Sequence, residues 1–223
     1  APDGLGSRAA IFSQRFSDGR IQFIDFIAND QTGIKSAFGA TTGENRFRKL
    51  LSDMRTDSDF TMAEVSEVVL RETMRRAEQK TFAAGRSFPE DYLAMKHVFF
   101  CEESGNRFPW EKEYEAWNET LPASLPVEAE IEKLFRAPAL EDWGVKDPAW
   151  ENEVNEAVKR ARKRARKAGK PETWLELLPE HLPDSYLAVW KNRLSEFAFI
   201  AYGLGEKEEA ALAGRCAKTL NTG

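Results

Sequence analysis

The sequence predicts an α+β protein in which helices dominate, with an N-terminal β-hairpin packed on helices and an all-helical C-terminal half. A strong hairpin signal lies between two β-favouring runs near the start of the chain. Helix-capping signals then recur, and prolines break the following region into short helical segments. We place a soft boundary in the proline-containing stretch 121–126, which gives a first part over residues 1–120 and a helical part over 121–223.

The composition is that of a soluble globular protein. Of 223 residues, 42% are hydrophobic and 31% charged, and no stretch approaches the roughly 20 apolar residues of a membrane-spanning helix. The two cysteines, Cys101 and Cys216, are far apart and have no CxxC spacing, which favours a reducing cytoplasm. A net charge of −5 argues against a surface that binds nucleic acid all over, but it permits a local basic patch.

The predicted hairpin runs over residues 9–16 and 21–27, joined by Ser17-Asp18-Gly19-Arg20. Asp-Gly between two β-favouring runs is typical of a tight hairpin turn, because both central residues tolerate positive φ. Both faces of the ribbon carry large apolar residues, and an isolated two-stranded ribbon is only marginally stable in water. We therefore expect helices or another strand to cover or extend it.

Three helices are expected next. Capping-box patterns at 41–44 and 61–64 predict the first two, and the second runs to a stop at Gly85. Residues 87–90 predict the start of a third helix that ends near residue 105. Its run 98–101 is also compatible with a strand that joins the hairpin, although the capping signal and the helical spacing of its apolar residues favour helix.

The C-terminal half is predicted to contain at least three helices. Asp147-Pro148 is a typical helix start, and Gly169-Lys170-Pro171 is a typical stop. A final pair is expected over about 184–203 and 206–220, joined at Gly203-Leu204-Gly205.

A basic run over residues 159–167 holds seven Lys or Arg residues and two alanines. Bases clustered along one helix are typical of phosphate binding, because each neutralised phosphate releases counterions. We assign a nucleic-acid-binding role to five of them, which are Lys159, Arg160, Lys163, Arg164 and Lys167. The alternative is a solvated helix matched to its own dipole, since three glutamates precede the bases.

The helix that carries this run also has a stripe of small residues suited to close packing on a neighbour. The stripe consists of Val154, Val158, Ala161, Ala165 and Ala168. It would turn Arg160, Lys163, Arg164 and Lys167 toward solvent.

Two further clusters hold residue types that metal or acid–base chemistry uses. His97 and Cys101 are four residues apart, but a metal site needs more ligands, so a core position for both is favoured. Asp25, Asp30 and Lys35 follow one another near the second strand, as acids and a lysine do in metal-dependent nuclease sites. The acid-x-Lys spacing of such sites is missing. We assign no catalytic residue and no metal ligand.

Six tryptophans fall between residues 110 and 190, where they could line a groove for peptides or bases. Anchoring of short helices is the favoured interpretation. The six are Trp110, Trp117, Trp143, Trp150, Trp174 and Trp190. Phosphate-loop, GxSxG and HExxH motifs are absent from the sequence, so we expect no cofactor.

Two segments carry resemblances. The segment from Ala201 to Leu220 resembles the middle of a tetratricopeptide repeat, which implies a helical hairpin, although it does not recur at the repeat's period of about 34 residues. The hairpin, followed by Phe26-Ile27-Ala28-Asn29-Asp30, Gly33, Lys35 and Phe38, is similar to a segment of an uncharacterised bacterial protein family; this resemblance implies no activity.

These observations favour a non-enzymatic interaction or adaptor protein of the bacterial cytoplasm, with a protein partner and no membrane association. Nucleic-acid or other polyanion binding through the helix 159–167 is one alternative. A metal-dependent enzyme that uses Asp25, Asp30 and Lys35 is the other.

Overall fold

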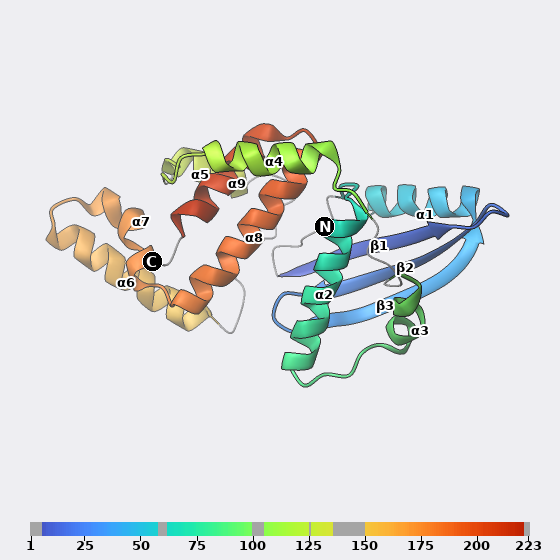
Figure 1. Ribbon diagram of the computed structural model, residues 1–223. Helices are drawn as coiled ribbons and strands as arrows, with labels where there is room; N and C mark the ends of the chain where they lie inside the picture. Colours follow the sequence, from blue (N-terminus) through green and yellow to red (C-terminus); the bar gives the residue numbers. More distant parts are fainter. Residues whose placement is uncertain (1–5, 58–61, 100–104, 125, 136–149, 221–223) are drawn as a thin grey trace. The chain divides into compact units, whose positions relative to one another are not determined.

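The protein is α+β and predominantly helical, as predicted. The computed structural model describes residues 6–57, 62–99, 105–124, 126–135 and 150–220 (Figure 1). The chain divides into two compact units, Ala1–Ala116 and Trp117–Gly223. We call them unit 1 and unit 2. The division lies within helix α4 (Pro109–Thr120), a few residues before the proline-containing stretch 121–126.

Unit 1 contains a three-stranded antiparallel sheet in the order β1-β2-β3. Strands β1 (Ser7–Arg15) and β2 (Arg20–Asn29) form the predicted hairpin. The turn differs from the predicted one, because Gly19 has a φ of 82° but Asp18 does not have a positive φ, and Arg15 pairs with Ile21. Strand β3 (Gly33–Gly43) continues the meander and was not predicted. It follows a turn in which the Asn29 side chain accepts hydrogen bonds from the backbone of Gln31 and Thr32. In the sequence, Asn29 was the residue that could have indicated a turn before this strand, because an Asn side chain can accept hydrogen bonds from the backbone two residues ahead.

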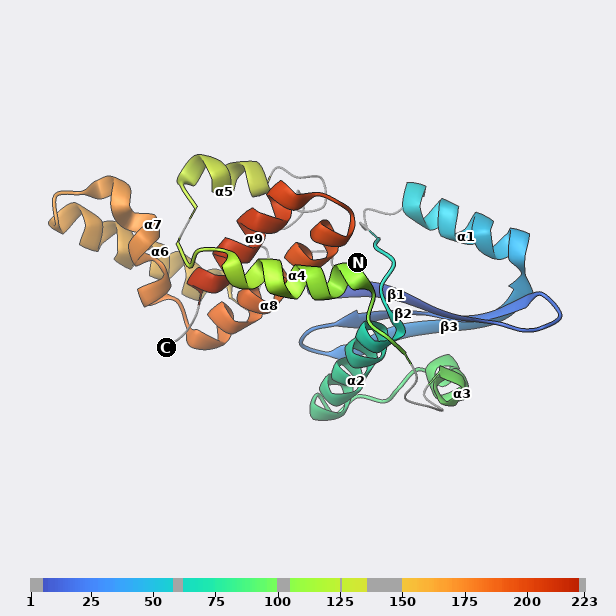
Figure 2. The same ribbon diagram turned by 45° about the horizontal axis from the view of Figure 1, so that its top comes forward.

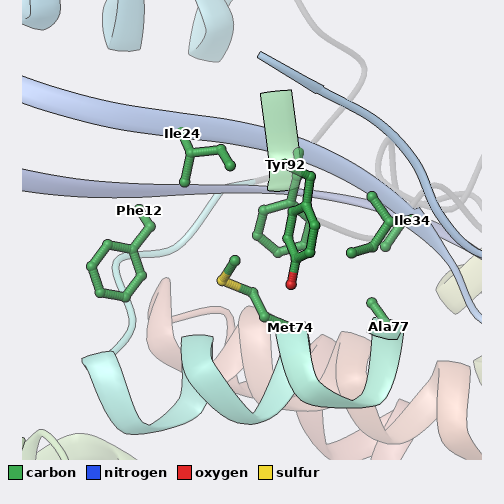
Figure 3. Close-up of a cluster of buried hydrophobic side chains, with 8 residues drawn as sticks. Phe12, Ile24, Ile34, Met74, Ala77 and Tyr92 are labelled. Carbon is green, nitrogen blue, oxygen red and sulfur yellow. The ribbon is translucent and has the colours of Figure 1, made fainter. Parts of the chain in front are cut away.

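Helices cover both faces of the sheet (Figure 2). Helix α1 (Glu44–Asp57) packs Phe47 against Ile21 and Phe23 of β2 on one face. On the other face lie helices α2 (Glu67–Ala83) and α3 (Glu90–Phe99). The main core sits between this face and α2, where Met74 and Tyr92 have no exposed surface (Figure 3). The apolar hairpin is therefore both extended by β3 and covered by helices.

Two of the predicted capping boxes are wrong. Residues 41–43 belong to β3, and α1 begins only at Glu44. Helix α2 begins at Glu67, not after residues 61–64, and its N-cap is Ser66, whose hydroxyl accepts a hydrogen bond from Val69 N. Helix α3 begins at Glu90 as predicted and is helical through Phe99. Residues 100–104, which include the rest of the run that could have been a strand, lie outside the described residues.

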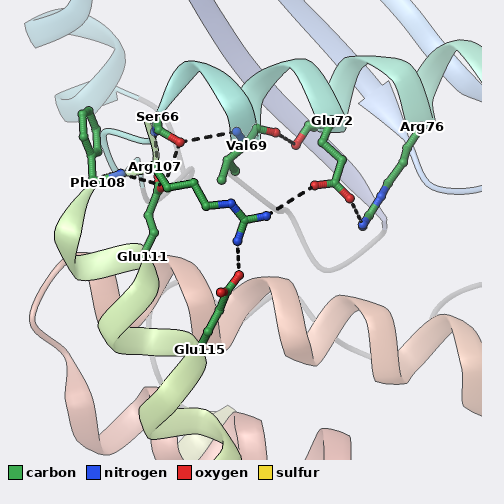
Figure 4. Close-up of polar contacts among 9 residues, drawn as sticks. Ser66, Val69, Glu72, Arg76, Arg107, Phe108, Glu111 and Glu115 are labelled. Atoms are coloured by element: carbon green, nitrogen blue, oxygen red, sulfur yellow. Dashed lines mark hydrogen bonds and ion pairs between the residues drawn. The ribbon is translucent and has the colours of Figure 1, made fainter. Parts of the chain in front are cut away.

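The side chain of Glu111 completes the caps of two helices at once (Figure 4). It is fully buried and accepts hydrogen bonds from Phe108 N, just before α4, at 3.0 Å and from Ser66 N at 2.7 Å. The Ser66 hydroxyl also donates to Glu111, at 2.7 Å. A capping box usually draws its acid from the third residue of the same helix, but in α2 that residue is Val69. Glu111 supplies the acid from α4 instead.

Unit 2 contains the rest of α4 and a series of helices. They are α5 (Glu128–Phe135), α6 (Glu151–Lys167), the single-turn helices η2 (Pro171–Thr173), α7 (Trp174–Leu177) and η3 (Pro179–His181), and then α8 (Asp184–Gly203) and α9 (Lys207–Thr219). The predicted final pair is confirmed by α8 and α9. Small buried residues, among them Ala198, Ala201, Ala213 and Gly214, lie on these two helices. The predicted start of α6 at Asp147-Pro148 lies outside the described residues.

Within the described part of the chain, no helix is both long enough and apolar enough to cross a membrane.

Candidate polyanion interface

Helix α6 carries the basic run of the sequence and buries one narrow face. Val154, Ala157, Ala161 and Ala165 are buried, at the three- and four-residue spacing of a helix face. The stripe differs from the predicted one, because Ala157 takes part, Val158 is half-buried and Ala168 is exposed. Short side chains on this face let α6 lie close to its neighbours. The helix ends as predicted, with Gly169 at a φ of 72°.

The residues flanking the buried stripe fix α6 against the segment that follows it. The Arg162 guanidinium lies 4.5 Å from the centre of the Trp174 ring, a cation–π contact. On the other flank, Arg164 forms an ion pair with Glu180. Arg164 was assigned to nucleic-acid binding, but this ion pair already engages its charge.

Lys159, also among the assigned residues, is engaged as well. Its amino group is 2.7 Å from the Glu156 carboxylate. The hydrogen bond and the charge of Lys159 hold the pKa of Glu156 below its usual value, with a smaller contribution from the charge of Arg160. The pair therefore marks where the acidic first part of α6 meets the basic second part.

Four bases remain exposed and form no ion pair with any described residue. They are Arg160, Lys163, Arg166 and Lys167, which we call the α6 patch. Three were predicted site residues. Arg166 was not predicted, although it belongs to the basic run. Its position on the helix, away from the stripe of small residues, could have indicated that it is exposed. Arg160, Lys163 and Lys167 recur at intervals of three and four, so they project from one side of the helix.

Asp25, Asp30 and Lys35 do not come together as one cluster, because Asp25 lies away from the other two. Asp30 N donates a hydrogen bond to Gly6 O at 2.8 Å, next to Ser7. Lys35 donates a hydrogen bond to the Ser7 hydroxyl at 2.9 Å, and Ser7 lies opposite Asn29 in the sheet. Roughly 13 Å of extended strand separates Asn29 from Asp25, at about 3.3 Å per residue. Asp25 instead lies between Ile11 and Phe38 of the neighbouring strands. Burial raises its pKa, and its Oδ1 atom is buried without a hydrogen-bond partner among the described residues.

The second cluster is not assembled as a core pair either. His97 is exposed on α3, contrary to the predicted core position, and Cys101 lies outside the described residues. Among the residues that the structure describes, no three His, Cys, Asp or Glu side chains are grouped so that they could hold a metal ion. Cys216 is a buried free thiol, and burial raises its pKa to about 11.

The five described tryptophans are all half-buried and pack against other groups. Trp117 packs on Tyr202 with ring centres 4.9 Å apart, and Trp150 packs on Tyr186 at 5.5 Å. Trp174 lies beneath Arg162. These contacts agree with a role in anchoring helices. Trp143 lies outside the described residues.

Comparison with known proteins gives no match. No protein family, curated protein or solved structure matches this chain.

Proposed function

We propose that this chain is a non-enzymatic interaction protein that binds nucleic acid through the α6 patch. The observation that carries the proposal is the exposure of Arg160, Lys163, Arg166 and Lys167 on about two turns of one helix, with no ion pair to any described residue. Neighbouring cations are engaged by Glu156, Glu180 and Trp174. The patch is thus the part of the basic run whose charge no described residue neutralises.

Mutual repulsion within the patch supports the same proposal. Lys163 and Lys167, both in the patch, are four residues apart. Like charges at this spacing destabilise a helix by about 0.2–0.5 kcal/mol per pair. The favourable dipole at the C-terminal end of α6 is matched by a few bases and does not require seven. A polyanion bound across the patch removes the repulsion and releases counterions from its phosphates.

The test is fluorescence anisotropy with labelled DNA of about 20 nucleotides, as single strand and as duplex, at about 50 mM KCl. Replacing all four residues of the patch with Gln keeps helix propensity, and binding should then be lost. The matched control replaces four exposed bases of unit 1, Arg46, Lys49, Lys80 and Arg86, with Gln. Both variants change the net charge equally, so the control should still bind.

Three results would overturn the proposal. Wild-type protein that binds neither form of DNA shows that the bases only solvate α6. Equal loss in the control variant shows that the whole charge of the protein, not the patch, governs binding. Displacement of the DNA by polyglutamate at equal charge concentration shows that the patch recognises an acidic protein segment rather than phosphates.

A further inference from the structure

The α6 patch has a sharp boundary at its N-terminal side. Glu151, Glu153 and Glu156 are exposed in the first turns of the helix. Their carboxylates repel phosphates, so a nucleic acid can lie only along the second half of α6. From Arg160 to Lys167 the helix advances about 10 Å, at 1.5 Å per residue. The contact is therefore short and involves a small number of phosphates.

Among the described residues of unit 2, the surroundings of the patch offer no exposed aromatic ring on which bases could stack. Proteins that hold single strands stack the bases on exposed aromatic rings. Among the described residues of unit 2, the large apolar side chains that are exposed are Val127 and Leu204, and neither is aromatic. Trp174 is the aromatic residue beside the basic run, but it is half-buried and packs against Arg162. Phosphate contacts are what this surface can make.

A duplex is the nucleic acid that suits phosphate contacts alone, because its bases are already stacked and its phosphates are outermost. It carries one charge per roughly 1.7 Å of axis, against one per 3.4 Å for each strand, so about six charges lie along the 10 Å of the patch. Resting on the function proposed above, we infer that the α6 patch binds double-stranded nucleic acid by its backbone, without reading base sequence and with little affinity for single strands.

The test compares a labelled duplex of about 20 base pairs with each of its separate strands and with a duplex of scrambled sequence, between about 50 and 200 mM KCl. The two duplexes should bind equally, and each strand at least fivefold more weakly. Four neutralised phosphates predict a slope of log affinity against log salt of about −3.6, which is roughly a 150-fold loss of affinity over this range.

The boundary of the patch gives a variant that should gain affinity. Glu156→Gln frees Lys159 and removes an adjacent negative charge. Duplex affinity should rise, and the slope should steepen by about 0.9, the value of one additional phosphate. Glu172→Gln is the matched control, because it changes the net charge of the protein by the same amount. Glu172 is exposed in the segment after α6 and has no ion pair with a described residue.

Failure of this inference differs from failure of the proposed function. Single strands that bind as tightly as the duplex, with loss of both in the fourfold Gln variant, overturn the duplex preference and leave nucleic-acid binding in place. Wild-type protein that binds no nucleic acid overturns both. An affinity that differs between the two duplex sequences shows base readout and also overturns the inference.

Discussion

Replacement of Glu111 by Gln should destabilise unit 1 strongly, although the two side chains have nearly the same shape. The Glu111 carboxylate is fully buried and accepts from Ser66 N, the Ser66 hydroxyl and Phe108 N. An amide has one acceptor oxygen, and its NH₂ group must face either Ser66 N or Phe108 N. One backbone N–H therefore loses its acceptor in either orientation, either the buried one of Ser66 or the partly buried one of Phe108.

The size of the effect follows from these contacts. An unsatisfied buried donor costs about 1–3 kcal/mol, and hydrogen bonds to a charged group are worth about 1.5–3 kcal/mol each. We therefore expect Glu111→Gln to lower the free energy of unfolding by about 2–4 kcal/mol. With an m value of about 2 kcal/mol/M, the urea midpoint falls by about 1–2 M. Urea unfolding followed by circular dichroism measures this shift.

The matched control is Glu113→Gln, which makes the same chemical change two residues along α4 at an exposed position. Its effect should stay within about 0.5 kcal/mol, as for most surface substitutions. If Glu111→Gln were as mild as this control, the double-cap interpretation would be refuted, because the buried carboxylate would then not hold the two helix starts together.

Two other positions allow similar tests. A Cβ atom at Gly33, where φ is 76°, would lie 2.2 Å from both the backbone N and the hydroxyl of Thr81, so Gly33→Ala should cost more than about 3 kcal/mol in thermal or urea unfolding. Gly85→Ala has the same left-handed backbone but open space around the Cβ, and should cost only the strain of about 1–2 kcal/mol; equal losses in the two variants would exclude the clash. Asp25→Asn should stabilise the protein at pH 7, because burial raises the pKa of Asp25 and so disfavours its charged form in the folded state. Below the unfolded-state pKa the Asp25 carboxyl is protonated in both states, so its burial carries no charge penalty. The penalty for burying the charged carboxylate develops as the pH rises through the folded-state pKa. The gain in melting temperature of Asp25→Asn over the wild type should therefore vanish near pH 3. A gain of the same size at both pH values would count against the electrostatic explanation.

Local patterns determined the elements whose signals lie within a few residues of one another. The Ser17-Asp18-Gly19-Arg20 pattern located the hairpin correctly, but the register is not that of a two-residue Asp18-Gly19 turn, because Arg15 pairs with Ile21 and only Gly19 of the two central residues has a positive φ. The helix stop at Gly169 and the connection between α8 and α9 were also located correctly, because a glycine at positive φ is a local signal for the end of a helix. The predominantly helical α+β class followed from the sum of such signals.

The start of α2 shows where local reasoning fails. Residues 61–64 have a capping-box pattern, yet the helix begins at Glu67 behind Ser66. Nothing near Ser66 in sequence indicates a cap of this strength, because the acid that completes it is Glu111, 45 residues away. A contact of that separation exists only once both helices are packed, so a pattern of neighbouring residues cannot contain it.

The candidate site divides along the same line. The sequence by itself determined that seven bases share one helical segment and that a stripe of small residues turns most of them outward. Only the tertiary structure decided which of these bases have a partner. Arg164 forms an ion pair with Glu180 and Arg162 a cation–π contact with Trp174, because the chain reverses direction after α6. The physical reason is range: helical periodicity is fixed by backbone geometry within a turn or two, whereas the partner of a long charged side chain depends on the three-dimensional path of the whole unit.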